Sequence, residues 1–190
     1  MPTPAPNNTI VQALPTFRYH PNPLETGDIV ESDNECLCCE RGRGYVYVGP
    51  VYAEEDLDEA VCPWCIASGL AFKKFDAQFT DAASIGGGIW PEISDEIIAE
   101  VSNRTPGFST MQHERWATCC NDAAAYVGMA GHAELMEKYP DAIEDIERDA
   151  TSTGANWETL FSELDVNGSA VAYVFQCLHC KRHTGYVDRD

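Results

Sequence analysis

The sequence predicts an α+β protein in which a small treble-clef or zinc-ribbon-like module with β-hairpins is followed by a helical middle region. Three observations predict this class. Cysteine pairs of the form Cys-x-x-Cys occur three times, and runs rich in β-branched and aromatic residues lie beside them. Between these parts, apolar residues recur at helical spacing. The 190 residues are enough for a metal-stabilised module joined to a second core.

Four segments are expected along the chain. Residues 1–13 are rich in proline and asparagine, which predicts a flexible tail. Residues 14–75 form the Cys-rich zinc module, and residues 76–168 form a mainly helical region. Residues 169–190 form a C-terminal β-hairpin with a Cys knuckle. We expect these parts to pack together as one compact unit.

Local patterns place the individual elements. Residues 45–48 and 51–52 flank Gly49-Pro50, which predicts two short strands joined by a turn. Helices are expected where apolar residues keep helical spacing, over residues 91–101, 110–127, 133–139 and 142–146. Strands are expected over residues 170–175 and 184–187, on either side of the third cysteine pair.

The first two cysteine pairs, Cys36/Cys39 and Cys62/Cys65, predict a structural zinc site. Two residues between cysteines let both sulfurs meet in one tight turn, and two such turns supply four thiolates. Cys62 opens an expected helical turn, whose N-terminus favours thiolates over thiols. Four thiolate ligands close the ion to chemistry. The alternatives are buried free thiols and a redox-active Cys62-Pro63-Trp64-Cys65, although the βαβ context of a thioredoxin-like site is absent.

A second zinc ion is the other metal hypothesis. The pair Cys177/Cys180 needs partners, and Cys119 and Cys120 are the thiols that remain once Cys38 is left over. Because the side chains of neighbouring residues tend to diverge, one of this doublet with a histidine would serve equally well. The histidines considered are His113, His179 and His183. The competing interpretation is a hairpin tip with two free thiols.

The charge balance limits the partners. Thirty-one acidic and twelve basic residues give a formal charge of −19, a field that repels phosphate backbones and anionic lipids. Nucleic acid and membrane are therefore not expected as partners, whereas a basic protein is. The sequence has no apolar run long enough to span a membrane and no pattern of a signal peptide. We expect a cytoplasmic protein, whose reduced cysteines are available to metals.

Catalytic motifs are not found. No second histidine completes an H-E-x-x-H motif after His113-Glu114, and no nucleophile elbow or phosphate loop is present. A non-enzymatic protein is therefore the main expectation. The alternative is a metal-dependent enzyme with a cleft around Arg104, His113 and Glu114, since polar and aromatic residues concentrate there.

Several segments resemble the CbrC family, a group of bacterial proteins that carry a colicin-tolerance label. The resembling segments are residues 14–24, 44–52, 62–69, 104–108, 114–116 and 175–180. The resemblance implies no established molecular activity, but it implies a link to tolerance of a bacterial toxin, or immunity to it. The expected function is a protein-interaction role, with zinc as a structural ion.

Overall fold

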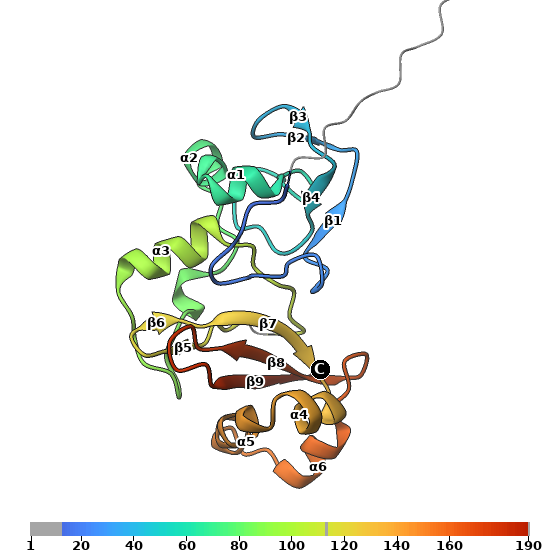
Figure 1. The fold of residues 1–190 in the computed structure, drawn as a ribbon, viewed down its shortest axis with the longest axis vertical. Coiled ribbons are helices and arrows are strands. Elements are labelled where there is room, and N and C mark those ends of the chain that lie inside the picture. Colours follow the sequence, from blue (N-terminus) through green and yellow to red (C-terminus); the bar gives the residue numbers. More distant parts are fainter. Residues whose placement is uncertain (1–12, 113, 190) are drawn as a thin grey trace, which may run out of the picture.

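The computed structural model describes residues 13–112 and 114–189 and confirms the predicted α+β class. Its parts follow one another along the long axis of the molecule (Figure 1). A small module of short strands and two helices lies at one end, and a three-stranded sheet covered by three helices lies at the other. None of the described helices is both long and apolar enough to cross a membrane.

The first end of the molecule is a pair of nested hairpins followed by two short helices. Its elements are β1 (Ile29–Glu31), β2 (Glu35–Cys36), β3 (Arg41–Gly42), β4 (Tyr45–Tyr47), α1 (Pro63–Ala67) and α2 (Leu70–Phe75). Strand β1 pairs with β4 and β2 pairs with β3, both antiparallel. This nesting places the turn that carries the first cysteine pair at the tip of the ribbon.

The hairpin expected around Gly49-Pro50 is wrong. The strand at residues 45–47 exists, but its partner is β1, and Tyr52 instead forms an isolated bridge with Gln78. Gly49 packs so closely on the Tyr47 ring that a Cβ there would lie 2.5 Å from the Tyr47 hydroxyl oxygen. The Tyr47 hydroxyl also donates to the Pro50 carbonyl at 2.9 Å, which directs the chain away from the sheet.

The middle of the chain contains fewer helices than expected. It comprises η1 (Ala82–Ser84), α3 (Asp95–Arg104), β5 (Thr118–Cys119) and β6 (Asp122–Ala123). Helix α3 starts after Ser94 rather than at Pro91, whose carbonyl accepts a hydrogen bond from the Thr118 hydroxyl. The helix expected over residues 110–127 is wrong, because this stretch forms β5, β6 and the start of β7. Apolar residues of this stretch are buried on both faces of the chain, so their spacing along the sequence did not indicate the single apolar face of a helix.

The second end is an antiparallel sheet with the order β7-β8-β9. Its elements are β7 (Ala125–Ala130), α4 (His132–Lys138), η2 (Pro140–Ala142), α5 (Ile143–Ser152), α6 (Trp157–Glu163), β8 (Ala170–Gln176) and β9 (His183–Arg189). The expected strands beside the third cysteine pair and the expected helices near residues 133–146 are confirmed, with α5 extending to Ser152. Strand β8 is apolar from Ala170 to Phe175 because both faces of the strand are covered. Val171, Tyr173 and Phe175 face the aromatic cluster around Phe108 and Trp116, called the middle core below. Ala172 and Val174 face the helices.

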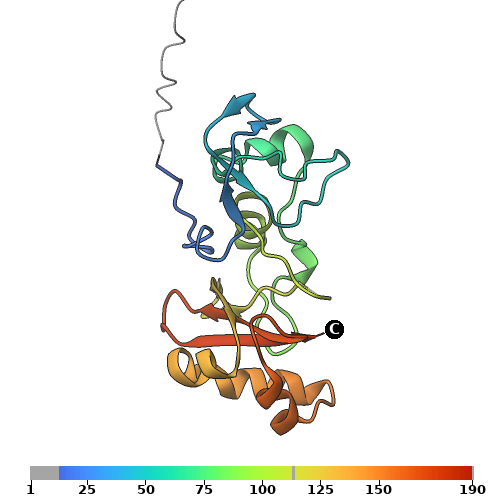
Figure 2. The same ribbon diagram turned by 90° about the vertical axis from the view of Figure 1, so that its right-hand side faces the viewer.

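An extended arm, residues 14–28, joins the two ends of the molecule. Figure 2 shows it in dark blue along one side of the first module, reaching the middle of the structure. Phe17 packs in the core of the first module, and Tyr19, two residues later, packs in the middle core with Trp116 and Phe108. The arm is therefore part of two hydrophobic cores, that of the first module and the middle core.

Candidate metal centres

The four sulfurs of the first predicted site lie together. The Sγ atoms of Cys36, Cys39, Cys62 and Cys65 are all within 4.8 Å of one another. The Cys36–Cys65 pair is 3.7 Å apart and the Cys39–Cys62 pair is 3.8 Å apart. Zinc bound at about 2.3 Å to four thiolates in a tetrahedron requires sulfur separations of about 3.8 Å. A disulfide needs about 2.05 Å. The residues therefore fit a zinc ion and not a pair of disulfides.

Two local structures bring these sulfurs together. Cys36 and Cys39 lie in the tight turn between β2 and β3, which is closed by the Glu40 N–H donating to the Cys36 carbonyl at 2.7 Å. Cys62 is the N-cap residue of α1, and Cys65 lies in its first turn. The Cys62 N–H donates to the Cys36 sulfur at 3.3 Å, so the helix start and the turn are already joined through a metal ligand.

The surroundings of the first cluster favour a negative charge on one of its sulfurs, that of Cys36. Contacts with the sulfurs of Cys62 and Cys65 lower the pKa of Cys36, and the contact with Cys36 raises the pKa of both Cys62 and Cys65. The Lys74 ammonium donates to the carbonyls of Leu37 and Cys38 at 3.0 and 3.2 Å, which places a positive charge beside the turn. Four sulfur ligands complete the preferred coordination of zinc and leave no position for a substrate.

Cys38 is the remaining thiol of this module. It is buried in the core of the first module, and its sulfur is not part of the four-cysteine group. Burial raises the pKa of its thiol. The expectation that Cys38 is the cysteine left over agrees with this grouping.

The second group consists of Cys119, Cys120, Cys177 and Cys180, whose sulfurs also lie within 4.8 Å of one another. Cys119 is 3.6 Å from Cys120 and 3.7 Å from Cys180. The adjacent cysteines converge because Cys120 and Asn121 have φ angles of 53° and 58° in the turn between β5 and β6. We expected neighbouring side chains to diverge, and a histidine was therefore an equal alternative as a ligand. That expectation applies to extended backbone and not to this left-handed turn.

The other half of the second group is the turn between β8 and β9. The Lys181 N–H donates to the Cys177 carbonyl at 3.1 Å, and the Cys180 N–H donates to the Cys177 sulfur at 3.4 Å. Although burial opposes it, hydrogen bonds from the Cys180 N–H, the Cys119 thiol and the His179 N–H lower the pKa of Cys177 to about 6. The turn therefore presents a sulfur that is readily ionised, as a metal ligand must be.

The histidines considered as ligands have other partners. His179 is hydrogen-bonded to Asp122 at 2.8 Å, and His183 is hydrogen-bonded to Asp141 at 2.9 Å. His113 lies outside the described residues. In the part of the chain that the structure describes, the two groups that could hold a metal consist of cysteines only.

Sequence reasoning missed Asp122, which lies directly beside the second group. This buried carboxylate accepts hydrogen bonds from the Tyr19 hydroxyl at 2.7 Å, from Arg18 at 2.5 Å and from His179. Burial opposes ionisation, but the hydrogen bonds from Tyr19 and His179 and the charge of Arg18 lower the pKa of Asp122. Only its position two residues after the cysteine doublet indicated a role, and most of its partners are more than fifty residues away.

The residues of the expected enzymatic cleft do not meet. Arg104 donates to the Ala67 carbonyl at 2.9 and 3.1 Å and forms an ion pair with Glu100. Glu114 accepts from the Tyr52 hydroxyl at 2.9 Å and lines a cavity that Arg104 does not line. The third member, His113, lies outside the described residues. The described side chains therefore support no shared cleft.

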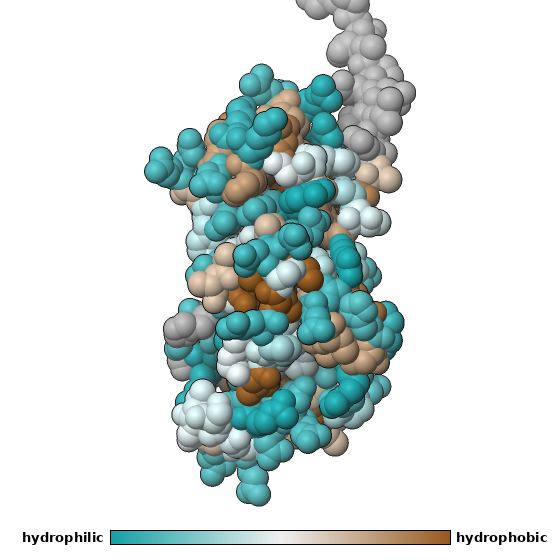
Figure 3. All heavy atoms as spheres, turned by 90° about the vertical axis from the view of Figure 1, so that its left-hand side faces the viewer, coloured by the Kyte–Doolittle hydropathy of each residue, from teal (hydrophilic) through white to brown (hydrophobic). Residues whose placement is uncertain are grey.

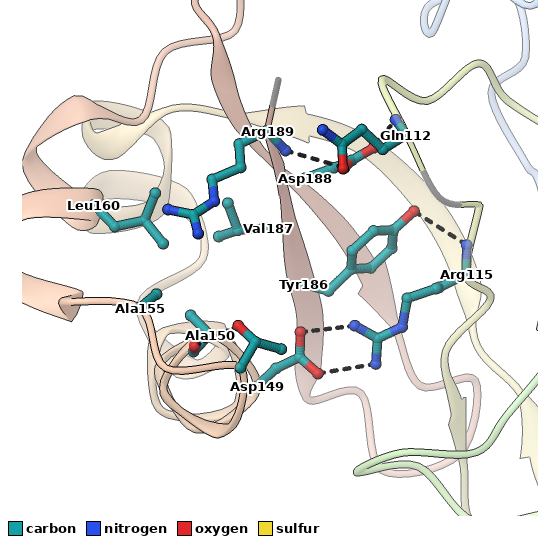
Figure 4. A pocket seen from close by; sticks show the side chains of 11 residues that line it. Gln112, Arg115, Asp149, Ala150, Ala155, Leu160, Tyr186, Val187, Asp188 and Arg189 are labelled. Carbon is teal, nitrogen blue, oxygen red and sulfur yellow. Dashed lines mark hydrogen bonds and ion pairs between the residues drawn. The ribbon is translucent and has the colours of Figure 1, made fainter.

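Arg115, the residue after Glu114, has contacts that give it a structural role. It forms two hydrogen bonds with Asp149 at 2.7 and 2.9 Å beside a cavity of about 260 Å³ (Figure 4). Its guanidinium also lies over the rings of Trp90 and Tyr186, at 4.6 and 5.1 Å from their centroids. These contacts fasten α5 to the sheet and occupy the charge of Arg115.

Comparison with known proteins covers nearly the whole chain. Residues 14–189 match the family described as "Uncharacterised protein family (UPF0167)". The UPF0167 protein Mb2317 of Mycobacterium bovis is 43% identical over 193 residues, which cover 97% of this chain and 98% of that protein. The UPF0167 protein PA1536 of Pseudomonas aeruginosa is 38% identical over 168 residues, covering 88% and 92% respectively. No solved structure matches.

Proposed function

The chain belongs to the UPF0167 family, and from this premise we propose that it is a non-enzymatic interaction protein that holds two structural zinc ions. The observation that carries the proposal is the spacing of the eight sulfurs in two groups of four. The first group also has an energetic rationale. Strands of two or three residues have little stability of their own, so metal binding would supply much of the folding free energy of this module.

The charge of the chain supports a basic protein as the partner, in preference to nucleic acid or membrane. The formal charge of −19 produces a field that attracts cationic surfaces over about one Debye length, roughly 8 Å at physiological salt. Figure 3 shows that hydrophilic side chains cover most of the face it views, with hydrophobic ones gathered near mid-height. Such a surface suits a partner that docks through charge.

The resemblance to the CbrC family supports the physiological side of the proposal. We place the protein in the cytoplasm, where reducing conditions keep cysteines available to zinc, and we connect its interaction role with tolerance of, or immunity to, a bacterial toxin. The segments that carry the resemblance include both the Cys62–Cys65 turn and the Cys177–Cys180 turn. The two zinc turns would hold the interaction surface in shape.

The metal part of the proposal is tested by zinc analysis of the full chain, purified under reducing conditions without chelators. We expect two zinc ions per chain, falling to one in Cys36→Ser and to one in Cys177→Ser. Cys38→Ser is the matched control and keeps both ions, since its sulfur lies outside the two groups. A protein that purifies without zinc, or variants that keep the full content, would contradict the proposal.

The partner part is tested by capture on the immobilised full chain from toxin-exposed bacterial cells, followed by elution with rising salt. We expect a basic protein that elutes as salt screens the charges. The chain denatured by removal of zinc serves as the control for unspecific binding to acidic protein. Capture of equal amounts by the native and denatured chains, or of no salt-sensitive basic protein, would oppose this part alone and leave the zinc result intact.

A further inference from the structure

The two cysteine groups differ in their access to solvent. In the first group, Cys36, Cys62 and Cys65 are each only 2% exposed. In the second group, Cys120 and Cys180 are exposed, and only Cys177 is fully buried. A reagent in solution can therefore reach two exposed sulfurs of the second group without any opening of the protein, whereas the first group has no exposed sulfur and only Cys39 is partly accessible.

A cavity leads to these exposed sulfurs. It has a volume of about 210 Å³, and Cys119, Cys120 and Cys180 form part of its wall. Arg182 and Arg148 also line it, and Arg148 forms an ion pair at 2.7 Å with Asp145, another lining residue. In a chain with a charge of −19, two arginines against one aspartate make this wall less negative than the chain as a whole, so small neutral polar molecules can approach the sulfurs.

We propose that the second cysteine group is an oxidant-responsive site, which reacts with small hydroperoxides and releases its metal, whereas the first group keeps its metal under the same conditions. The proposal rests on the proposed function, because it takes zinc to be bound at both groups. Zinc-bound cysteines are thiolates, and the thiolate is the nucleophilic form of cysteine. An exposed, ionised sulfur beside a second sulfur is the arrangement that oxidation to a disulfide requires.

The geometry selects the sulfurs that react. Cys180 is exposed, and the Cys119 sulfur lies 3.7 Å from it on the opposite turn. The adjacent pair Cys119 and Cys120 is also close, but consecutive Cα atoms are only about 3.8 Å apart, which is shorter than the separation that disulfides usually span. A disulfide between the two turns is therefore favoured over one within the doublet.

The reaction has two steps. The Cys180 thiolate attacks the outer oxygen of the hydroperoxide, the O–O bond breaks, and the leaving alkoxide takes a proton to become an alcohol, or water if hydrogen peroxide reacts. The Cys119 thiolate then attacks the sulfenic acid sulfur, and the departing hydroxide takes a proton to become water. The two sulfurs lose two electrons and the hydroperoxide gains them. Zinc keeps its oxidation state and leaves, because only two thiolates remain.

The experiment uses the full chain with its zinc content measured beforehand, titrated with hydrogen peroxide in the presence of a chromogenic zinc chelator. We expect one of the two ions to be released, and peptide mapping to show a disulfide between the β5–β6 turn and the β8–β9 turn. Cys38→Ser should behave as the wild type does. Cys36→Ser, which retains only the second group, should release its ion at the wild-type rate, and Cys177→Ser should release none.

Three outcomes would overturn the inference. These are release of both ions together, release of neither, or a disulfide within the first group. Peptide mapping of the wild type decides the question even if a variant fails to fold. A chain that holds no zinc at the second group before oxidant is added would refute the proposed function and with it this inference, whereas two bound ions with equal reactivity would refute the inference alone.

Discussion

The hydroxyl of Tyr19 donates a hydrogen bond of 2.7 Å to Oδ1 of Asp122, which lies 103 positions later in the chain. Oδ2 of the same carboxylate accepts from Arg18 and from His179, the residue directly before Cys180. One buried side chain thereby connects the N-terminal arm, the β5–β6 turn and the β8–β9 turn. The two halves of the second cysteine group are held in register by this carboxylate as well as by their sulfurs.

Replacement of Asp122 by alanine should therefore detach the arm. The expected loss in the free energy of unfolding is about 3 kcal/mol, because Tyr19 and Arg18 lose a shared buried acceptor. Hydrogen exchange should show faster exchange of the amides of residues 17–20. Asp145→Ala is the matched control, since Asp145 pairs with the exposed Arg148 and should cost less than about 1 kcal/mol. Equal effects of the two changes would contradict the role given to Asp122.

The substitution Cys62→Ser separates the metal from the helix cap. Cys62 makes no side-chain capping hydrogen bond and serine is a good N-cap residue, so the start of α1 loses nothing while the first site loses a ligand. We expect zinc at this site to be lost and the amides of residues 29–75 to lose protection in hydrogen exchange, while β7, β8 and β9 keep theirs. The first module would be independent of the metal if its protection survived this change.

Gly107 is predicted to tolerate no side chain. A Cβ built there would lie 1.8 Å from the carbonyl oxygen of Phe79, an atom of the backbone that cannot rotate away. Gly107→Ala should lower the free energy of unfolding by about 3 kcal/mol or more, as measured in urea. Gly42→Ala is the control, because the nearest atom there is 3.7 Å away. A loss of less than about 1 kcal/mol in the free energy of unfolding of Gly107→Ala would contradict this prediction, because it would show that the backbone segments around Gly107 and Phe79 can move apart.

Asp28 should give the protein a measurable pH dependence. Burial raises the pKa of this carboxyl to about 7 in the folded chain, from 3.8. Between these values the folded state holds a proton that the unfolded state has released, so Asp28 reduces stability as the pH rises, and this effect levels off once the pH has passed about 7. Relative to the wild type, Asp28→Asn should therefore gain more stability from pH 6 to 7 than from pH 7 to 8.

The measurement for Asp28 is urea unfolding at several pH values between 6 and 8 with zinc retained. The nearby His20, whose pKa is lowered to about 4 by burial, is present in both proteins, so its contribution cancels in the comparison. Asp33→Asn, at an exposed carboxyl, is the control for exchanging acid for amide. A difference between Asp28→Asn and the wild type that is the same at pH 6 and pH 7 would refute the assignment.

The grouping of the metal-site cysteines could be predicted from sequence because their spacing is local. A Cys-x-x-Cys pair determines its own turn, and two such pairs predict a site without knowledge of the path between them. The convergence of Cys119 and Cys120 was less evident, since it depends on a left-handed turn that the residue types only permit. Asp122 could not be found this way, because its partners Arg18 and Tyr19 are distant in sequence.

The errors in the fold have a similar origin. The alanine run at residues 123–125 resembles a helix, but Ala124 and Ala125 are covered on all sides by the aromatic middle core and the sheet. Tertiary burial thus overrode local propensity. The strand at residues 45–47 was identified correctly. Its partner β1, however, lies before the β2–β3 hairpin in the chain, and neither strand alone indicates a pairing across an intervening hairpin.

The extended arm has a consequence for the order of assembly on the ribosome. The arm is the first described segment to be synthesised, yet Arg18 binds a residue 104 positions later, and that residue in turn binds His179 near the end of the chain. Translation proceeds at roughly 5–20 residues per second, so the arm waits several seconds for its partners. Docking of Tyr19 in the middle core is therefore a late event, and a nascent chain stalled before residue 122 would still expose Tyr19 to chaperones, whereas Phe17 can already pack in the first module.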